Sequence, residues 1–286
     1  MSEKVLIIGA GHAGGILATQ LARGKGRYDI TVIGEETHPP YERPPLSKQL
    51  LAGEVPVEKT HLRPEKFYQD RDITLKLSSR VKAIYRTEKA VELEDGTTMS
   101  YDKLALCTGT RVREIPVPGA DMPGVHYIRT IDDTLGIQKA LKPESDVVVI
   151  GGGYIGLEAA AVARQMGLTT SVLEMAPRVL ARVTSPVMSE FYEDEHRRQG
   201  VEILTETSLS RLEGKEGAVT SAILSDGTKL DADIVLVGIG ILPNEELAKE
   251  AGIACNNGIL VDRDARTSDP RIFAAGDCAS RPLVHF

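Results

Sequence analysis

Two sets of glycines have the spacing G-x-G-x-x-G, the pattern in this chain most directly tied to chemistry. They are Gly9, Gly11 and Gly14 in the first set, and Gly151, Gly153 and Gly156 in the second. In such a loop the first glycine permits a tight turn, the second lets the backbone approach a pyrophosphate, and the third allows a helix to pack closely on a strand. The N–H groups at the start of that helix then bind the phosphates. Because glycines cluster in many loops, the interpretation depends on the elements around each set.

The residues around both sets predict a strand before the loop and a helix after it. Val5–Ile8 and Val147–Ile150 are short, continuous apolar runs, typical of buried parallel strands. Apolar residues then recur at helical spacing from Ile16 to Ala22 in the first copy and over Leu157–Ala163 in the second. A second strand follows in each copy, which completes a strand, helix, strand unit. Two such units predict two dinucleotide sites.

Each copy also carries an acidic residue at the end of its second strand. Glu35 follows Ile30–Ile33, and Glu174 follows Thr170–Leu173. A carboxylate at this position accepts hydrogen bonds from the ribose hydroxyls of an adenosine. Either glutamate alone is equally well explained as a solvated strand-end residue, but two in register favour dinucleotide binding.

Glu174 also bears on the choice between NADH and NADPH. Its charge would repel a 2′-phosphate, which favours NADH. Arg178 and Arg182 follow closely in the sequence, and an arginine accommodates that phosphate, so NADPH stays open on the residues alone.

Antiparallel hairpins are expected outside these units. Ile73–Leu75, Val81–Ile84 and Ala90–Leu93 resemble strands, with a Gly-containing turn after the last of them. Ser221–Leu224, a second such turn and Ile234–Val237 give a similar pattern in the second half. The prolines between residues 39 and 45 exclude a regular helix or central strand there.

Composition limits the class of protein. With 286 residues, 42% of them hydrophobic and 26% charged, the chain is expected to form two globular domains. No apolar run reaches the length of about 20 residues that a membrane helix needs, so a cytoplasmic protein is expected. The net charge of −7 argues against a nucleic-acid or anionic-membrane partner. The sequence does not determine the oligomeric state.

The cysteines and histidines predict neither a disulfide framework nor a metal site. The cysteines are Cys107, Cys255 and Cys278, and the histidines are His12, His38, His61, His126, His196 and His285. The cysteines form no C-x-x-C pattern and are expected to be buried free thiols. The histidines lack metal-ligand spacing and are expected at the surface or in packing.

Three blocks of sequence are more specific than the glycine loops. They are Tyr41–Lys48 (YERPPLSK), Gly151–Glu158 (GGGYIGLE), and Thr267–Pro270 (TSDP) ahead of Gly276-Asp277. Together they resemble the FAD-dependent ferredoxin reductases of bacterial oxygenase systems, and the resemblance covers essentially the whole chain.

The resemblance implies an α/β fold with two Rossmann-like dinucleotide-binding domains of the glutathione-reductase type. It implies an FAD-binding domain of residues 1–111 and 242–286, with an NADH-binding domain of residues 112–241 inserted in it. The first glycine loop then binds FAD and the second binds NADH, an assignment that spacing alone does not make.

Site residues follow from the resemblance by position. The implied FAD contacts are Ala13, Glu35, Lys48, Val81, Arg129 and Asp277. The other expected cofactor-binding residues are Arg43, Tyr154, Ile155 and Gly240, together with Glu174 and the loop glycines. Lys48 is expected to pair with Glu158 beside the flavin ring, which makes these two the expected catalytic residues. The alternative for Lys48 is a solvated loop lysine.

The implied activity is hydride transfer from NADH to FAD, followed by single-electron transfer to an iron–sulfur ferredoxin or a rubredoxin. The absence of a suitably spaced cysteine pair argues against relay through a redox-active disulfide. Two alternatives are an NADH oxidase or quinone or dye reductase, and a nucleotide-binding fragment without catalysis.

The similar reductases continue past the Gly-Asp motif into a helix whose N-terminus faces the flavin, and then into a C-terminal domain. On this resemblance, the chain is expected to lack both. Since a helix N-terminus stabilises negative charge, weaker FAD binding is expected without it.

Overall fold

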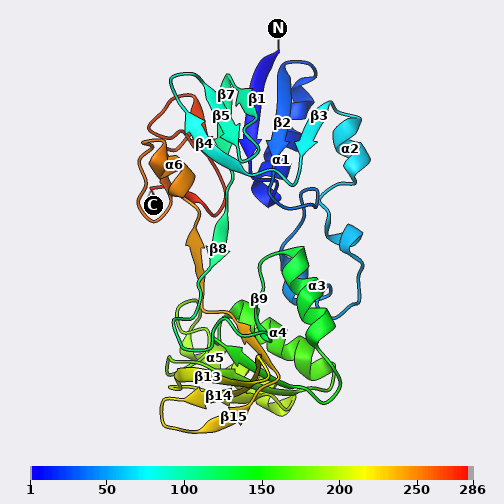
Figure 1. Ribbon diagram of the computed structural model, residues 1–286, viewed down its shortest axis with the longest axis vertical. Coiled ribbons are helices and arrows are strands. Elements are labelled where there is room, and N and C mark those ends of the chain that lie inside the picture. The colour runs from blue at the N-terminus through cyan, green and yellow to red at the C-terminus, as the bar shows by residue number, and fades with distance from the viewer. Residues whose placement is uncertain (1, 283–286) are drawn as a thin grey trace. The chain divides into compact units, whose positions relative to one another are not determined.

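The structure is a computed structural model that describes residues 2–282. The chain divides into two compact units (Figure 1). Unit 1 contains the residues up to Glu42, then Glu58–Arg111, and then the residues from Leu242 on. Unit 2 contains Arg43–Val57 and Val112–Ile241.

Unit 1 is built on a parallel sheet of five strands in the order β19-β7-β1-β2-β3. The strands are β1 (Glu3–Ile8), β2 (Tyr28–Ile33), β3 (Ile73–Lys76), β7 (Lys103–Leu106) and β19 (Ile272–Ala274). Helix α1 (His12–Leu21) connects β1 to β2. Four consecutive residues at the end of both β1 and β2 are buried, as expected for strands that are covered on two faces.

The two faces of this sheet pack against different layers. Alternate residues such as Ile7 and Val32 share a core with Ala18 of α1. Their neighbours, such as Ile8 and Leu106, share a second core with the antiparallel sheet β4-β5-β6. That sheet consists of β4 (Val81–Tyr85), β5 (Ala90–Leu93) and β6 (Thr98–Ser100). The period of two along each strand thus sorts the side chains between two cores.

Shorter elements complete unit 1. They are the 3₁₀ turns η1 (Ala22–Gly24) and η3 (Val57–Thr60), helices α2 (Glu65–Gln69) and α6 (Glu246–Glu250), and the paired strands β18 (Ile259–Leu260) and β20 (Ala279–Ser280). Strands β8 (Thr110–Val112) and β17 (Ile241–Pro243) pair with each other where the chain passes between the units.

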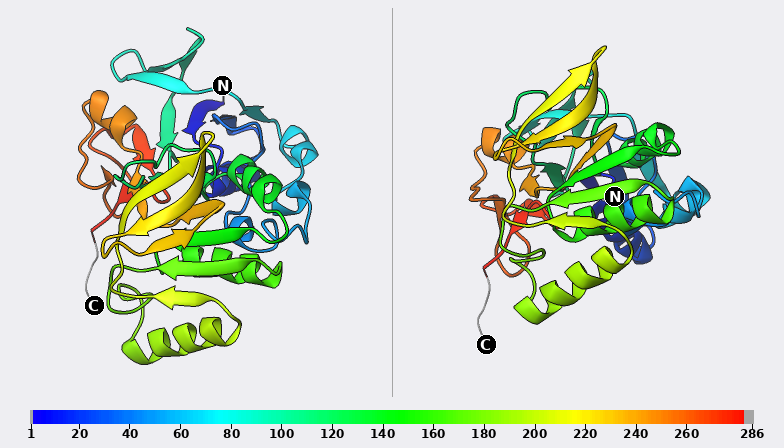
Figure 2. Two further views of the ribbon diagram at one scale, coloured as in Figure 1. Left: turned by 60° about the horizontal axis from the view of Figure 1, so that its bottom comes forward. Right: turned by 90° about the horizontal axis from the view of Figure 1, so that it is seen from below.

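Unit 2 repeats the plan with a parallel sheet in the order β12-β11-β10-β16-β9. Its strands are β9 (Val125–Tyr127), β10 (Asp146–Ile150), β11 (Thr169–Leu173), β12 (Glu202–Leu204) and β16 (Ile234–Val237). Its helices are α3 (Ile131–Ala140), α4 (Tyr154–Gln165) and α5 (Pro186–Arg198). An antiparallel sheet of β13 (Leu209–Lys215), β14 (Ala218–Leu224) and β15 (Lys229–Asp231) packs against β16 through β14 (Figure 2).

Two of the expected hairpin pairings are wrong. Ile73–Leu75 belongs to β3, which pairs in parallel with β2 instead of joining the β4-β5-β6 sheet. Ile234–Val237 forms β16, which pairs in parallel with β10, while β14 pairs with β13 and β15. All four residues of β16 are buried, which is typical of a central parallel strand and unlike the alternation of a half-exposed hairpin.

The segment Arg43–Val57 packs with unit 2, although the expected FAD-binding domain included it. It contains the 3₁₀ turn η2 (Pro44–Ser47). The Thr134 hydroxyl of α3 donates to the carbonyl of Leu46 at 3.2 Å, and the Gln138 amide donates to the carbonyl of Leu50. Side chains of α3 therefore hold this segment by its backbone.

None of the helices within residues 2–282 is both long enough and apolar enough to cross a membrane.

Candidate dinucleotide sites

The first glycine loop lies between β1 and α1. Gly9 has φ +112°, and a Cβ on it would lie 2.1 Å from the carbonyl oxygen of Cys107. A Cβ on Gly14 would lie 2.0 Å from the carbonyl oxygen of Gly9. Both positions thus require glycine for the packing of strand, loop and helix. The helix begins after Gly11, which as its N-cap offers no side-chain acceptor to the first N–H groups.

In the second loop, between β10 and α4, the glycines required by packing can be told apart from the glycine that a ligand would require. A Cβ on Gly151 would lie 2.5 Å from the carbonyl of Gly238, and one on Gly156 would lie 2.0 Å from the carbonyl of Gly151. At Gly153 the nearest atom to such a Cβ is the Gly238 carbonyl oxygen at 4.0 Å. The protein's own packing therefore does not require glycine at Gly153, whereas close approach of a pyrophosphate does.

The start of α4 is also suited to a bound phosphate. Its N-cap, Gly153, makes no side-chain hydrogen bond to the first turn, and the side chains of Tyr154 and Ile155 are exposed. By contrast, α3 begins with a complete capping box in which Thr130 and Asp133 satisfy each other's backbone N–H groups. The residues at the start of α4 therefore fit a dinucleotide pyrophosphate.

Glu174 is fixed beside this loop. One carboxylate oxygen accepts a hydrogen bond from Gly152 N–H at 2.8 Å, and the other accepts one from Ala176 N–H at 2.7 Å. Glu35 in unit 1 is exposed, and the Nε of Arg80 lies 3.8 Å from its carboxylate. Glu35 follows β2 and Glu174 follows β11, the strand after the helix in each copy, but only Glu174 is held by two backbone donors.

Arg178 is committed to its own loop. It donates to the carbonyl oxygens of Thr184 and Ala181, both at 3.0 Å, and to the hydroxyl of Ser189 at 2.6 Å. Its guanidinium therefore orders the loop before α5 and is not positioned as a free phosphate ligand. Two arginines left NADPH open, and these hydrogen bonds remove Arg178 from consideration. Arg182 is then the arginine through which a 2′-phosphate stays open.

Lys48 and Glu158 meet in unit 2, as expected for the pair. The Lys48 ammonium lies 2.8 Å from a carboxylate oxygen of Glu158. The same oxygen accepts a hydrogen bond from the hydroxyl of Ser47 at 2.6 Å. Ser47 was not among the expected site residues, although its place beside Lys48 in the YERPPLSK block was the available signal.

The remaining expected contacts divide between the units. In unit 2, Arg43 donates a hydrogen bond to the backbone carbonyl of Arg129. Gly240, with φ +113°, accepts a backbone hydrogen bond from Arg113 at 2.9 Å.

In unit 1, the Gly276-Asp277 loop comes close to the first turn of α1. A Cβ on Gly276 would lie 2.9 Å from the Cβ of Ala13, so glycine permits this approach. Asp277 is exposed, and Val81 is buried at the start of β4. The structure therefore brings the residue before Asp277 up to Ala13, while Val81 lies on a neighbouring sheet.

All three cysteines are free thiols. Burial, with a smaller contribution from Cys278, raises the pKa of Cys107 to about 12, so this thiol does not ionise at neutral pH. The Cys278 thiol donates to the carbonyl of Leu106 at 3.4 Å. Within residues 2–282 no group of three or more His, Cys, Asp or Glu is placed to hold a metal ion, and His285 lies outside these residues.

Comparison with known proteins agrees with this geometry. Residues 3–285 match the pyridine nucleotide-disulphide oxidoreductase family. The chain is 45% identical to the probable ferredoxin reductase CtmF of Castellaniella defragrans, over 99% of this chain and 69% of that protein. It is 41% identical to putidaredoxin reductase CamA of Pseudomonas putida, over 97% of this chain and 67% of that protein.

A solved structure of the covalent complex of putidaredoxin reductase with putidaredoxin has the same fold. It superposes with a TM-score of 0.95 at 41% identity, over 98% of this chain and 68% of that one. The predicted α/β class with two dinucleotide-binding units is thereby confirmed. The chain belongs to the pyridine nucleotide-disulphide oxidoreductase family and, within it, to the flavin-dependent ferredoxin reductases.

Proposed function

We propose that this chain passes electrons from NADH through FAD to a small iron–sulfur protein of the ferredoxin or rubredoxin type that serves an oxygenase. The observation that carries the proposal is the pair of strand, glycine-loop, helix sites, each with a glutamate at its second strand end. The relatives support the choice of acceptor, since they include ferredoxin reductases and, at 38% identity, a rubredoxin-NAD(+) reductase of Pseudomonas putida. The chain spans about two-thirds of their length (69% of CtmF).

The assignment gives each unit one cofactor. In unit 1, the first glycine loop, Glu35, Val81 and Asp277 would hold FAD. In unit 2, the second loop, Tyr154, Ile155, Gly240 and Glu174 would hold NADH. Lys48, Arg43 and Arg129 are proposed FAD contacts on unit 2.

FAD, when bound, would supply the redox chemistry, since a flavin can accept a hydride and release single electrons. The chain's own residues bind the two cofactors and orient them. Glu158 and Lys48 form an adjacent anion and cation whose joint charge is small, and this pair is proposed to set the electrostatic surroundings of the flavin ring. No nucleophile or metal is required.

Glu174 supports NADH over NADPH. Because its carboxylate is fixed by Gly152 and Ala176, it cannot turn away from a 2′-phosphate without losing two hydrogen bonds. Arg178, the nearest arginine in the loop that follows, is already used by backbone carbonyls. We also propose a cytoplasmic location, because three free thiols are typical of a reducing compartment.

The test is an anaerobic titration of the purified protein with NADH, followed by the flavin absorbance. Bleaching of the yellow protein, and its recovery on adding an oxidised ferredoxin, is the expected result. Recovery only with oxygen or a quinone would instead identify an oxidase or quinone reductase. A protein that takes up no FAD would overturn the proposal and leave a nucleotide-binding fragment.

Variants of the two glutamates test which unit holds which cofactor. Glu174→Ala is expected to raise the NADH concentration required for reduction by about tenfold or more while FAD content is unchanged, since one lost charge-assisted hydrogen bond accounts for about 1.5–3 kcal/mol. Glu35→Ala is the matched control and should lower FAD content instead. Equal loss of FAD in both variants would contradict the assignment.

A further inference from the structure

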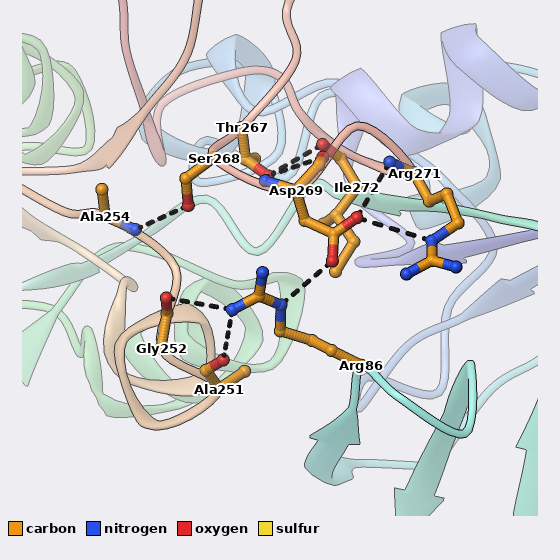
Figure 3. Close-up of polar contacts among 9 residues, drawn as sticks. All are labelled: Arg86, Ala251, Gly252, Ala254, Thr267, Ser268, Asp269, Arg271 and Ile272. Carbon is orange, nitrogen blue, oxygen red and sulfur yellow. Dashed lines mark hydrogen bonds and ion pairs between the residues drawn. The ribbon is translucent and has the colours of Figure 1, made fainter.

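A salt bridge between the buried carboxylate of Asp269 and the partly exposed side chain of Arg86 lies in unit 1, among residues that are not proposed cofactor contacts (Figure 3). Within residues 2–282, Asp269 is the one acidic residue classed as buried, at 3% exposure. Its carboxylate accepts a hydrogen bond from Arg86 Nε at 3.0 Å and another from the backbone N–H of Arg271 at 3.0 Å. The Arg271 guanidinium adds a looser ion pair, with Nε 3.6 Å from the carboxylate.

Arg86 also binds a second segment. As Figure 3 shows, its guanidinium lies between Asp269 and two backbone carbonyls, those of Ala251 at 3.4 Å and Gly252 at 3.2 Å. These carbonyls belong to the C-terminal end of α6, where helix carbonyls lack partners within the helix. One side chain therefore joins the end of α6 to the TSDP turn.

Asp269 also organises the turn that starts β19. Its carbonyl accepts a hydrogen bond from Ile272 N–H at 3.0 Å, and its own N–H donates to the Thr267 hydroxyl at 3.1 Å. The Thr267 hydroxyl donates in turn to the Ile272 carbonyl at 2.9 Å. Ser268 accepts a hydrogen bond from Ala254 N–H at 3.2 Å, so the turn is tied to the chain after α6 a second time.

The joined segments lead to proposed FAD contacts. Arg86 follows directly on β4, the strand that begins at Val81. The TSDP turn leads into β19, which ends just before the Gly276-Asp277 loop. The salt bridge thus connects the far end of β4 to the far end of β19 and lies at the opposite strand ends from these contacts.

The energetics of an ion pair with one buried partner favour a role beyond stability, since the Asp269 side chain is 4% exposed and the Arg86 side chain 35%. An apolar pair of similar size often stabilises a fold as well as a buried ion pair does, because the charges lose hydration. Unlike an apolar contact, the ion pair makes directional hydrogen bonds, and these hold the joined segments in one arrangement.

We propose that Arg86 and Asp269 are positioning residues for FAD binding, whose salt bridge sets β4 and the Gly276-Asp277 loop at the spacing that the cofactor requires. This inference rests on the proposed function, because it takes FAD as the ligand of unit 1.

The experiment measures the FAD dissociation constant and the melting temperature of the apoprotein for wild type, Arg86→Met, Asp269→Asn, and the double variant Arg86→Met/Asp269→Leu. Both single variants are expected to weaken FAD binding at least tenfold at a temperature where they are folded, with NADH binding unchanged. The double variant removes the uncompensated charge that each single variant leaves, so its melting temperature is expected to lie above those of the single variants while its FAD affinity stays as low as theirs. Ile30→Val, which thins the core on the other face of the sheet, is the matched control for lost stability.

Two outcomes would overturn the inference in different ways. If FAD affinity follows melting temperature across all variants, including Ile30→Val, the salt bridge only stabilises the fold. If the wild-type chain itself binds no FAD, the proposed function fails, and this inference fails with it.

Discussion

The carboxylate of Glu158 has two donors in unequal surroundings. Ser47 is buried at 4% exposure, whereas the Lys48 side chain is 41% exposed. A hydrogen bond from a neutral donor to a charged group stabilises by about 1.5–3 kcal/mol, while an exposed ion pair contributes about 0–1 kcal/mol. The buried serine, rather than the lysine, therefore determines where this carboxylate lies.

Removal of the Ser47 hydroxyl tests whether Ser47 contributes more than Lys48 to holding the Glu158 carboxylate. Ser47→Ala is expected to lower the free energy of unfolding by about 1.5–3 kcal/mol in the wild-type background, and by much less in a Glu158→Gln background. Chemical denaturation of the four proteins measures the coupling, with Ser47→Thr as the control that keeps a hydroxyl. Equal losses in both backgrounds would show that Ser47 does not act through Glu158.

Pairs of interacting side chains could be predicted from the sequence only where the resemblance implied them. The pairing of Lys48 with Glu158 could be expected from the resemblance. Ser47 lies 111 positions from Glu158, and Arg86 lies 183 positions from Asp269, so no local pattern links either pair. A hydroxyl or guanidinium finds many acceptors in a fold, and only the packing decides which one it meets.

The two glycine loops show how element geometry separates structural from ligand-binding positions. Gly151 and Gly156 are required by contacts within 2.5 Å of the Cβ position, but Gly153 is not. The two kinds of glycine should therefore respond differently to the same substitution.

Gly153→Ala is expected to fold with a melting temperature close to wild type while NADH binding weakens at least tenfold, because the added methyl group occupies space beside the pyrophosphate. Gly156→Ala is the matched control and should lower the melting temperature sharply, since its methyl group overlaps the carbonyl of Gly151. Calorimetry and an NADH binding isotherm check both. Normal NADH binding by Gly153→Ala would show that no ligand approaches this glycine.

Strands were easier to predict than their pairings. The apolar runs of β1, β2, β10 and β11 identify buried strands directly. Hairpin turns were assigned from Gly-containing tetrads, and this succeeded for β5-β6. It failed for Ile234–Val237, because Lys229–Asp231 forms a short strand, β15, that pairs with β14 and leaves β16 free to join the parallel sheet.

Over the whole molecule, each unit contains a histidine held neutral by its surroundings. Burial lowers the pKa of His61 in unit 1, with a further lowering by His38, against the opposing charges of Glu58 and Glu65. Burial likewise lowers the pKa of His126 in unit 2, against the opposing charge of Asp133. The unfolded chain therefore takes up a proton at a higher pH than the folded units do.

Acid is thus expected to weaken each unit through its own histidine. The stabilisation is fully present above the unfolded pKa of about 6.5 and decreases as the pH falls below it, because protonation favours the unfolded chain. His61→Asn should reduce this dependence in unit 1 alone, and His126→Asn in unit 2 alone. Hydrogen exchange of peptides from each unit at pH 7.5 and 5.5 measures it. An unchanged slope in both variants would place the acid sensitivity elsewhere.

The segment Arg43–Val57 shows why the assignment of chain segments to units is hard to read from a sequence. The chain passes from unit 1 to unit 2 after Arg111 and returns after Ile241, and Arg43–Val57 also packs with unit 2. The prolines of this segment excluded regular secondary structure but did not indicate which unit it would pack with. The hydrogen bonds of Ser47, Leu46 and Leu50 to helices of unit 2 decide its placement.

The order of strands in unit 1 has a consequence for how the protein is made. Strand β19, at one edge of the sheet and beside β7, comes from the last part of the chain, whereas every strand of unit 2 precedes it. On the ribosome, unit 2 therefore has all its strands available while the sheet of unit 1 still lacks one. The unit that begins first is completed after unit 2, and β7 keeps an unpaired edge until synthesis reaches Ile272.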